Sequence, residues 1–415
     1  MSQTSLSLRK GFSLDQTFAA LKYPNYRLWF FGQMTSLFGT WMQSTAQGYL
    51  AFELTHSAAY LGYISFASGL PSWLLILFGG VVADRVPRRS LLVVTQTLQM
   101  LLAFVLALLA FLHVVQPWHI VALAFLLGVT NAFDTPARQS FVLELVDREH
   151  LTNAIALNST MFNTAVVVGP ATAGLAYAAF GPGWCFLLNG VSFIAVIAAL
   201  LQMKLKRPPI RPHHTSALSE LKEGLRYAMG HPIIRALVAM MSISAVFGIS
   251  YGTIFPAWAV DVLHGDARTN GLLVSARGVG SLIAALFVAS TAHTGKKGRI
   301  LTFGTFLFPV ALLGFAFARW LPASLLLLVV AGGAQVLFGN LANALVQTQA
   351  ADELRGRVMA LYSLTFMGLQ PLGGLLVGVA AQGIGEPLTV VLAAIITFGL
   401  AVGMWVFEPA IRALD

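Results

Sequence analysis

The sequence predicts an all-α integral membrane protein whose twelve spanning helices form two pseudo-symmetric halves of six helices each. Hydrophobic residues make up 57% of the 415 positions and charged residues only 10%, whereas roughly a quarter of the residues in a soluble domain are charged. The apolar residues fall into twelve stretches close to the ~20 residues that a spanning helix needs. One long polar segment separates the first six stretches from the last six.

The twelve predicted helices follow one another with short connections. They lie at 27–50, 58–82, 91–114, 118–138, 151–179, 184–203, 233–257, 270–291, 299–317, 322–347, 358–381 and 387–407. The chain thus divides into an arm (1–26), a first half (27–203), a linker (204–232), a second half (233–408) and a tail (409–415). The arm lacks the apolar core of a signal peptide, and we expect its residues 14–21 to form a short amphipathic piece at the membrane interface.

The linker contains four prolines, the pair His213 and His214, and a predicted short helix at 219–229. Two adjacent histidines with no neighbouring cysteine or acid make a weak set of metal ligands. We interpret them as part of a solvated linker and predict neither a metal site nor a cofactor. The single cysteine, Cys185, excludes a disulfide within the chain.

The distribution of basic residues predicts the orientation. With the N-terminus in the cytoplasm, all of the 25 Lys and Arg residues except Arg268, Arg277 and Arg319 fall in or beside cytoplasmic segments. Because Lys and Arg concentrate in cytoplasmic loops, we expect both termini to lie in the cytoplasm and the protein to reside in a bacterial inner membrane.

The two halves show a weak internal repeat. Ala156, Leu157 and Ser159 recur 204 positions later at the start of the eleventh helix, as Ala360, Leu361 and Ser363. Repeated halves of six helices are typical of secondary transporters.

A short basic hairpin joins the second and third helices, where residues 79–89 read GGVVADRVPRR. Its arginines help to fix topology, but a carboxylate contributes little to orientation, so Asp84 needs another explanation. An acid at the membrane edge is stabilised by a base or by a helix N-terminus. We interpret Asp84 as one side of a latch between the halves; the alternative is that it balances the arginines of its own loop.

This hairpin resembles the signature of the major facilitator superfamily of transporters, G-x-x-x-D-R-x-G-R-R. The matching residues are Gly80, Asp84, Arg85, Arg88 and Arg89, with Pro87 where the family usually has glycine. The resemblance implies the major facilitator fold. It also implies that Asp84 meets the start of the eleventh helix, where the basic residues are Arg355 and Arg357.

Two further stretches resemble one particular branch of this superfamily. Residues 135–141, TPARQSF, follow the fourth helix, and residues 347–349, QTQ, follow the tenth. Both resemble the branch of the superfamily that contains the enterobactin exporters and some macrolide efflux pumps, known as the transmembrane secretion effector type. We also assign Asp134 and Arg138, at the cytoplasmic end of the fourth helix, to the gating residues.

The first helix contains a polar stripe that predicts a substrate cavity. Gln33, Ser36, Thr40, Gln43 and Gln47 are spaced by three or four residues and therefore share one helix face. Such a face is directed toward protein or water rather than lipid. We favour cavity lining, with hydrogen bonding between helices as the alternative.

Further cavity candidates come from other helices. They are mostly amides and aromatic hydroxyls: Asn131, Asn158, Asn163, Tyr251, Gln335, Asn340, Asn343, Tyr362 and Gln370. Arg277 joins them as a charged residue about 10 Å along the eighth helix. Two interpretations of Arg277 stay open: its side chain reaches the outer surface, or it contacts an anionic or neutral substrate.

These observations favour a secondary transporter that exports a small organic molecule by alternating access. A siderophore or similar metabolite, a drug, and in the opposite direction a nutrient are the alternatives. A membrane-embedded enzyme would need a buried cluster of acids, histidines or cysteines, which the sequence lacks. We expect a small-molecule substrate, contact with membrane lipid, no nucleic acid and a monomer. Because no acid lies near a helix centre, a coupling proton and antiport are implied by the resemblance alone.

Overall fold

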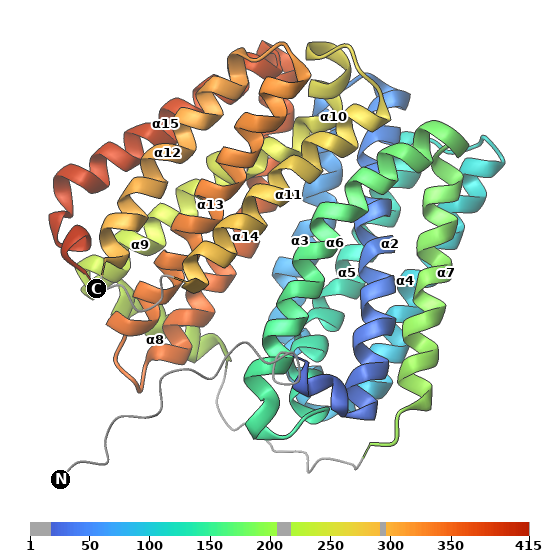
Figure 1. The fold of residues 1–415 in the computed structure, drawn as a ribbon, viewed down its shortest axis with the longest axis horizontal. Coiled ribbons are helices and arrows are strands. Elements are labelled where there is room, and N and C mark those ends of the chain that lie inside the picture. The colour runs from blue at the N-terminus through green and yellow to red at the C-terminus, as the bar shows by residue number, and fades with distance from the viewer. Residues whose placement is uncertain (1–17, 206–216, 291–295, 415) are drawn as a thin grey trace, which may run out of the picture.

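The computed structural model describes residues 18–205, 217–290 and 296–414, and within these ranges all regular structure is helical. Figure 1 shows two groups of helices, one coloured blue to green and the other yellow to red. The first group contains α2 (Pro24–Thr55), α3 (Ala58–Arg85), α4 (Arg88–Phe111), α5 (Pro117–Phe141), α6 (Leu151–Phe180) and α7 (Pro182–Gln202). Three short 3₁₀ turns, Ala19–Lys22, Val142–Glu144 and Arg148–His150, lie beside them.

The second group begins after the linker helix α8 (Ala217–Gly230), where a short helix is expected. It contains α9 (Pro232–Ile243), α10 (Phe255–Ala257), α11 (Ala267–Ser290), α12 (Lys297–Phe317), α13 (Leu321–Gln349), α14 (Arg355–Ile384) and α15 (Glu386–Phe407), and ends in the 3₁₀ turn Pro409–Ala413. His213, His214 and residues 14–17 of the expected amphipathic piece lie outside the described residues.

Eleven segments of the described chain are long and apolar enough to cross a membrane. Helix α2 is absent from this group although it has 32 residues. Its polar stripe explains the difference, because glutamines and hydroxyls lower its mean hydropathy. Together with α2, the eleven segments form the twelve long elements of the fold.

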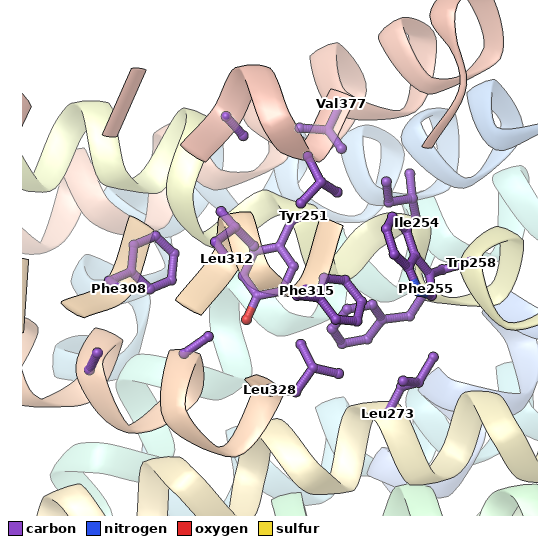
Figure 2. Packing of buried hydrophobic residues seen from close by; sticks show 14 of the residues in the cluster. Tyr251, Ile254, Phe255, Trp258, Leu273, Phe308, Leu312, Phe315, Leu328 and Val377 are labelled. Atoms are coloured by element: carbon purple, nitrogen blue, oxygen red, sulfur yellow. The ribbon is translucent and has the colours of Figure 1, made fainter. Parts of the chain in front are cut away.

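The seventh element is not the continuous α-helix that the sequence predicts at 233–257. After α9 the chain forms a π-helical segment (Ser244–Ile249), a 3₁₀ segment (Ser250–Ile254), the single turn α10 and a second π-helical segment (Trp258–Val262). Gly248 and Gly252 weaken the α-helix here, and Pro256 cannot donate a backbone hydrogen bond. The break lies within the aromatic core of the second half, where Trp258 stacks on Phe315 at a centroid distance of 4.3 Å (Figure 2).

We call the end of the molecule at which α8 lies the linker side, and the opposite end the far side (Figure 1). The halves touch on the far side. A Cβ atom added at Gly378 of α14 would lie 2.7 Å from the carbonyl oxygen of Ala58 and 2.8 Å from Cα of Gly62 on α3. Helices α6 and α11 meet similarly, and Ser275 Oγ donates to the carbonyl of Val167 at 2.6 Å. Small residues permit this close approach.

Candidate substrate cavity

A cavity of about 710 Å³ lies between the halves and reaches the start of α14 on the linker side. Six helices of the first half line it, but α14 alone lines it from the second half. Its polar lining consists of Gln33, Ser36, Thr40, Ser65, Ser68, Ser72, Gln96, Gln99, Asn131, Asp134, Thr135, Arg138, Arg357, Ser363 and Gln370. Aromatic rings of Trp41, Trp73, Phe162, Phe193 and Phe366 share the lining.

Five of the sequence-predicted cavity residues line this space. They are Gln33, Ser36, Thr40, Asn131 and Gln370. Sequence reasoning missed Gln96 and Gln99 of α4. Their signal was present, because two glutamines three positions apart interrupt a largely apolar helix.

The far-side part of the α2 stripe lies outside the cavity lining, which corrects the expectation for Gln43 and Gln47. Both side chains are buried, and the Gln43 carbonyl oxygen accepts a 2.7 Å hydrogen bond from the Asn189 amide of α7. For Gln43 this contact is the hydrogen bonding between helices that we gave as the alternative to cavity lining. The stripe is longer than the cavity, so its far end packs against a neighbouring helix.

The remaining amide and tyrosine candidates also lie outside the lining. These are Asn158, Asn163, Tyr251, Gln335, Asn340, Asn343 and Tyr362. Several bond within their own half: Asn163 donates to the Ser159 carbonyl, Asn343 accepts from Gln347, and Tyr362 donates to the Gly339 carbonyl. Tyr251 belongs to the aromatic core seen in Figure 2 and is 1% exposed.

Arg277 takes a position that neither sequence interpretation describes. Its guanidinium carbon lies 5.9 Å from the ring centres of both Tyr251 and Phe255. A Cβ atom at Gly252 would lie 2.5 Å from Arg277 Nη1, so the absent side chain makes room for the cation. The structure therefore places Arg277 against the broken seventh element, within the second half and outside the cavity lining.

Among the described residues that line the cavity, Asp134 is the one with an acidic side chain. It is 1% exposed, and its Oδ1 accepts hydrogen bonds from Thr95 Oγ1 at 2.8 Å and Gln96 Nε2 at 2.9 Å. Its Oδ2 lies 3.6 Å from Arg138 Nε. One turn away, Gln99 Nε2 donates to Asn131 Oδ1 at 3.0 Å. Helix α4 thus fixes the polar groups that α5 presents to the cavity.

The predicted latch contact between Asp84 and Arg355 or Arg357 is not formed in this structure. Asp84 lies 3.5 Å from Arg88, which also binds Glu144 at 2.6 Å. On the other side of the opening, Arg355 binds Asp352 at 2.5 Å and Arg357 binds Glu223 of α8 at 2.6 Å. The two halves are separated at the linker side, where the cavity lies between Arg138 of α5 and Arg357 of α14.

The other residues of the basic hairpin remain within the first half. Arg89 donates to the Leu201 carbonyl at 2.7 Å, while Arg85 is exposed at the end of α3. A Cβ atom at Gly80 would meet no atom within 4 Å, so close packing does not require glycine at this position in the present conformation.

Comparisons with known proteins agree with this architecture. The profile of the family described as transmembrane secretion effector matches residues 15–415. The staphyloferrin A transporter of Staphylococcus aureus is 26% identical over 86% of this chain and 90% of its own length. The multidrug efflux pump Tap of Mycolicibacterium fortuitum is 26% identical over 93% and 96%, and the enterobactin exporter EntS of Citrobacter koseri is 25% identical over 92% and 90%.

Solved structures support the fold. A D-xylose–proton symporter superposes with a TM-score of 0.73 at 14% identity, covering 94% of this chain and 99% of its own. A bacterial homologue of the lysosomal transporter Spinster, in an inward-facing and unoccupied conformation, gives 0.66 at 14% identity, covering 97% and 96%. The family match spans nearly the whole chain, so this protein belongs to the transmembrane secretion effector family of major facilitator transporters and is not an enzyme.

Proposed function

We propose that this transporter exports a small organic molecule from the cytoplasm by alternating access, with a siderophore or similar metabolite as its substrate. The observation that carries the proposal is the cavity of about 710 Å³, which is lined by both halves and reaches the linker side, while backbones pack together on the far side. The basic residues concentrate on the linker side, which the distribution of charge assigns to the cytoplasm. A cavity that opens toward the cytoplasm is in position to receive a molecule made inside the cell.

The direction of transport rests on the relatives. Proteins matched over most of the chain are named as an enterobactin exporter and a multidrug efflux pump. The many amides and hydroxyls of the lining suit a polar, oxygen-rich molecule. Inward movement of protons in exchange for the substrate would supply the driving force.

Drug efflux is the second candidate. Trp41, Trp73, Phe162 and Phe366 give the cavity aromatic surface that can bind apolar compounds of varied shape. This surface lies in the same cavity as the amides, so the two candidates differ in the ligand and share the route.

One experiment separates the candidates. The purified protein is reconstituted into vesicles with an imposed proton gradient, and uptake is measured for metabolites that a deletion strain fails to secrete and for ethidium as a drug. Gradient-driven accumulation of a secreted metabolite supports the metabolite proposal, while accumulation of ethidium alone supports the drug pump. If neither accumulates but a nutrient moves in the opposite direction, the proposal of export is wrong.

A further inference from the structure

Arg138 has hydrogen-bonding capacity that the protein leaves unused. Within the described ranges, three charged side chains line the cavity: Asp134, Arg138 and Arg357. Arg357 is occupied by Glu223 at 2.6 Å. Arg138 approaches a carboxylate only through Nε, at 3.6 Å from Asp134, and no further partner of its guanidinium is found among the described residues. Its two terminal nitrogens are therefore available to a ligand.

Asp134 holds Arg138 in place without covering these nitrogens. The carboxylate is buried and fixed by Thr95 and Gln96 through Oδ1, which leaves Oδ2 for Arg138 Nε. A guanidinium has five N–H donors in a planar fork, and its Nη pair matches the two oxygens of a carboxylate. The geometry thus orients a cationic fork beside a polar cavity.

Two carbonyl oxygens in the same lining also lack partners. Gln33 is 2% exposed and Gln96 is 1% exposed, and the Oε1 atom of each is buried without a hydrogen-bond donor. Both residues line the cavity together with Arg138. A buried acceptor without a donor is unfavourable, so a ligand that supplies a hydroxyl or an N–H group would satisfy one of these atoms.

We propose that the first half contains a subsite for a small organic carboxylate that carries a neighbouring hydroxyl group. Arg138 binds the carboxylate, Gln33 Oε1 accepts the single O–H of the hydroxyl, and the rings of Trp41 and Trp73 cover the apolar part. Asp134 is a positioning residue that orients Arg138. This inference rests on the proposed function, because it takes the cavity to be the substrate cavity, and it names the class of substrate.

The test uses three matched probes of one size: 2-hydroxy-4-phenylbutyrate, 4-phenylbutyrate, which lacks the hydroxyl, and 2-hydroxy-4-phenylbutanamide, which lacks the charge. Their affinities for the purified full-length protein in detergent are measured by ligand-observed NMR titration. The hydroxy acid is expected to bind tightest. Loss of the hydroxyl should weaken binding several-fold, and loss of the charge should weaken it about tenfold, as for a charge-assisted pair of hydrogen bonds.

Substitutions then assign the groups. Arg138→Gln should lower the affinity for both acids about tenfold and leave the amide unchanged, whereas Gln33→Leu should reduce the preference for the hydroxyl. Arg412→Gln is the matched control for loss of one positive charge, because Arg412 lies over Trp405 at 4.9 Å, outside the cavity lining. It should change none of the three affinities.

Several outcomes would overturn the subsite. Equal affinity for the three probes would do so, as would an equal loss for all three in Arg138→Gln. If that variant does not fold, Arg138→Lys decides, because lysine keeps the positive charge but lacks the planar pair of terminal nitrogens, so the affinity for both acids should fall and the affinity for the amide should stay unchanged. Transport by the unchanged protein in vesicles is measured separately. Transport without charge selectivity would reject the subsite but leave the proposed export function standing. Selective binding without transport would support the subsite but reject the export function.

Discussion

The two halves share a repeat but treat their polar groups differently. The first half presents Gln33, Gln96, Asn131 and Arg138 to the cavity from α2, α4 and α5. The second half packs Arg277 against aromatic rings and contributes only α14 to the lining. Pseudo-symmetry of sequence therefore does not imply equal roles. In this conformation the first half supplies most of the cavity lining, and the second half contains an aromatic core.

The largest effect is expected where the halves meet. Gly378→Leu adds a side chain whose Cβ would lie 2.7 Å from the Ala58 carbonyl oxygen, so the far side should open and transport should be lost. Overpacking of this kind costs about 1–3 kcal/mol, enough to change a two-state population roughly 5- to 150-fold. Distances between spin labels on the far ends of α3 and α14 report the opening.

Gly399→Ala on α15 is the control, since its Cβ would meet no atom within 4 Å. Unchanged label distances in Gly378→Leu would show that the far side is not closed by these backbones.

Thr40 and Gln43 separate cavity lining from packing within the first half. Thr40→Leu should reduce transport in vesicles and spare the melting temperature, because Thr40 lines the cavity. Gln43→Leu should lower the melting temperature, since it leaves the buried Asn189 amide unpaired, at a cost of about 1–3 kcal/mol. The comparison fails if the two variants show the same pattern of transport and stability.

Substitution of two acids on the linker side, Asp84 and Glu223, should shift the inward-open fraction in opposite directions. Asp84→Asn removes the acid of the predicted latch, which is expected to form when the cytoplasmic side closes, so the inward-open fraction should rise. Glu223→Gln releases Arg357 from its 2.6 Å pair in the present conformation, so that fraction should fall. Each pair is partly exposed, and shifts of a few-fold are expected from about 0.2–1 kcal/mol.

Spin labels on the linker-side ends of α3 and α14 measure these fractions. A shift in the same direction for both variants would contradict exchange of Arg357 between the two acids. No shift in Asp84→Asn would show that the acid serves its own loop.

The smallest effect is expected from Arg277→Gln. Loss of the contacts with Tyr251 and Phe255 removes a cation–π interaction of about 0.5–2 kcal/mol, which should lower the melting temperature by a few degrees. Charge preference in transport should remain, because the residue is outside the cavity lining. A change in charge preference without a change in melting temperature would assign Arg277 to the substrate instead.

The fold was predictable because hydropathy and basic loops are local signals. Twelve long elements follow directly from them, and even the low hydropathy of α2 reflects the polar stripe that the sequence reveals. The site was only partly predictable. A stripe shows which residues share a face, but it does not show where the cavity ends, so Gln33 and Gln43 look alike in sequence and differ in the structure. The partners of Asp134 on α4 depend on contacts between helices that spacing alone does not specify.

Under the proposed alternating access, the break in the seventh element is expected to restrict how the halves move. Its π and 3₁₀ turns leave backbone groups less regularly paired than an α-helix does, and such backbone is tolerated at membrane depth only where protein or a water-filled cavity covers it. Here Tyr251, Phe255 and Trp258 are at most 1% exposed and surround the break. Exposure of this segment to hydrocarbon would be costly at every stage of the cycle. The second half is therefore expected to turn as a unit around this segment, which stays shielded from the bilayer throughout.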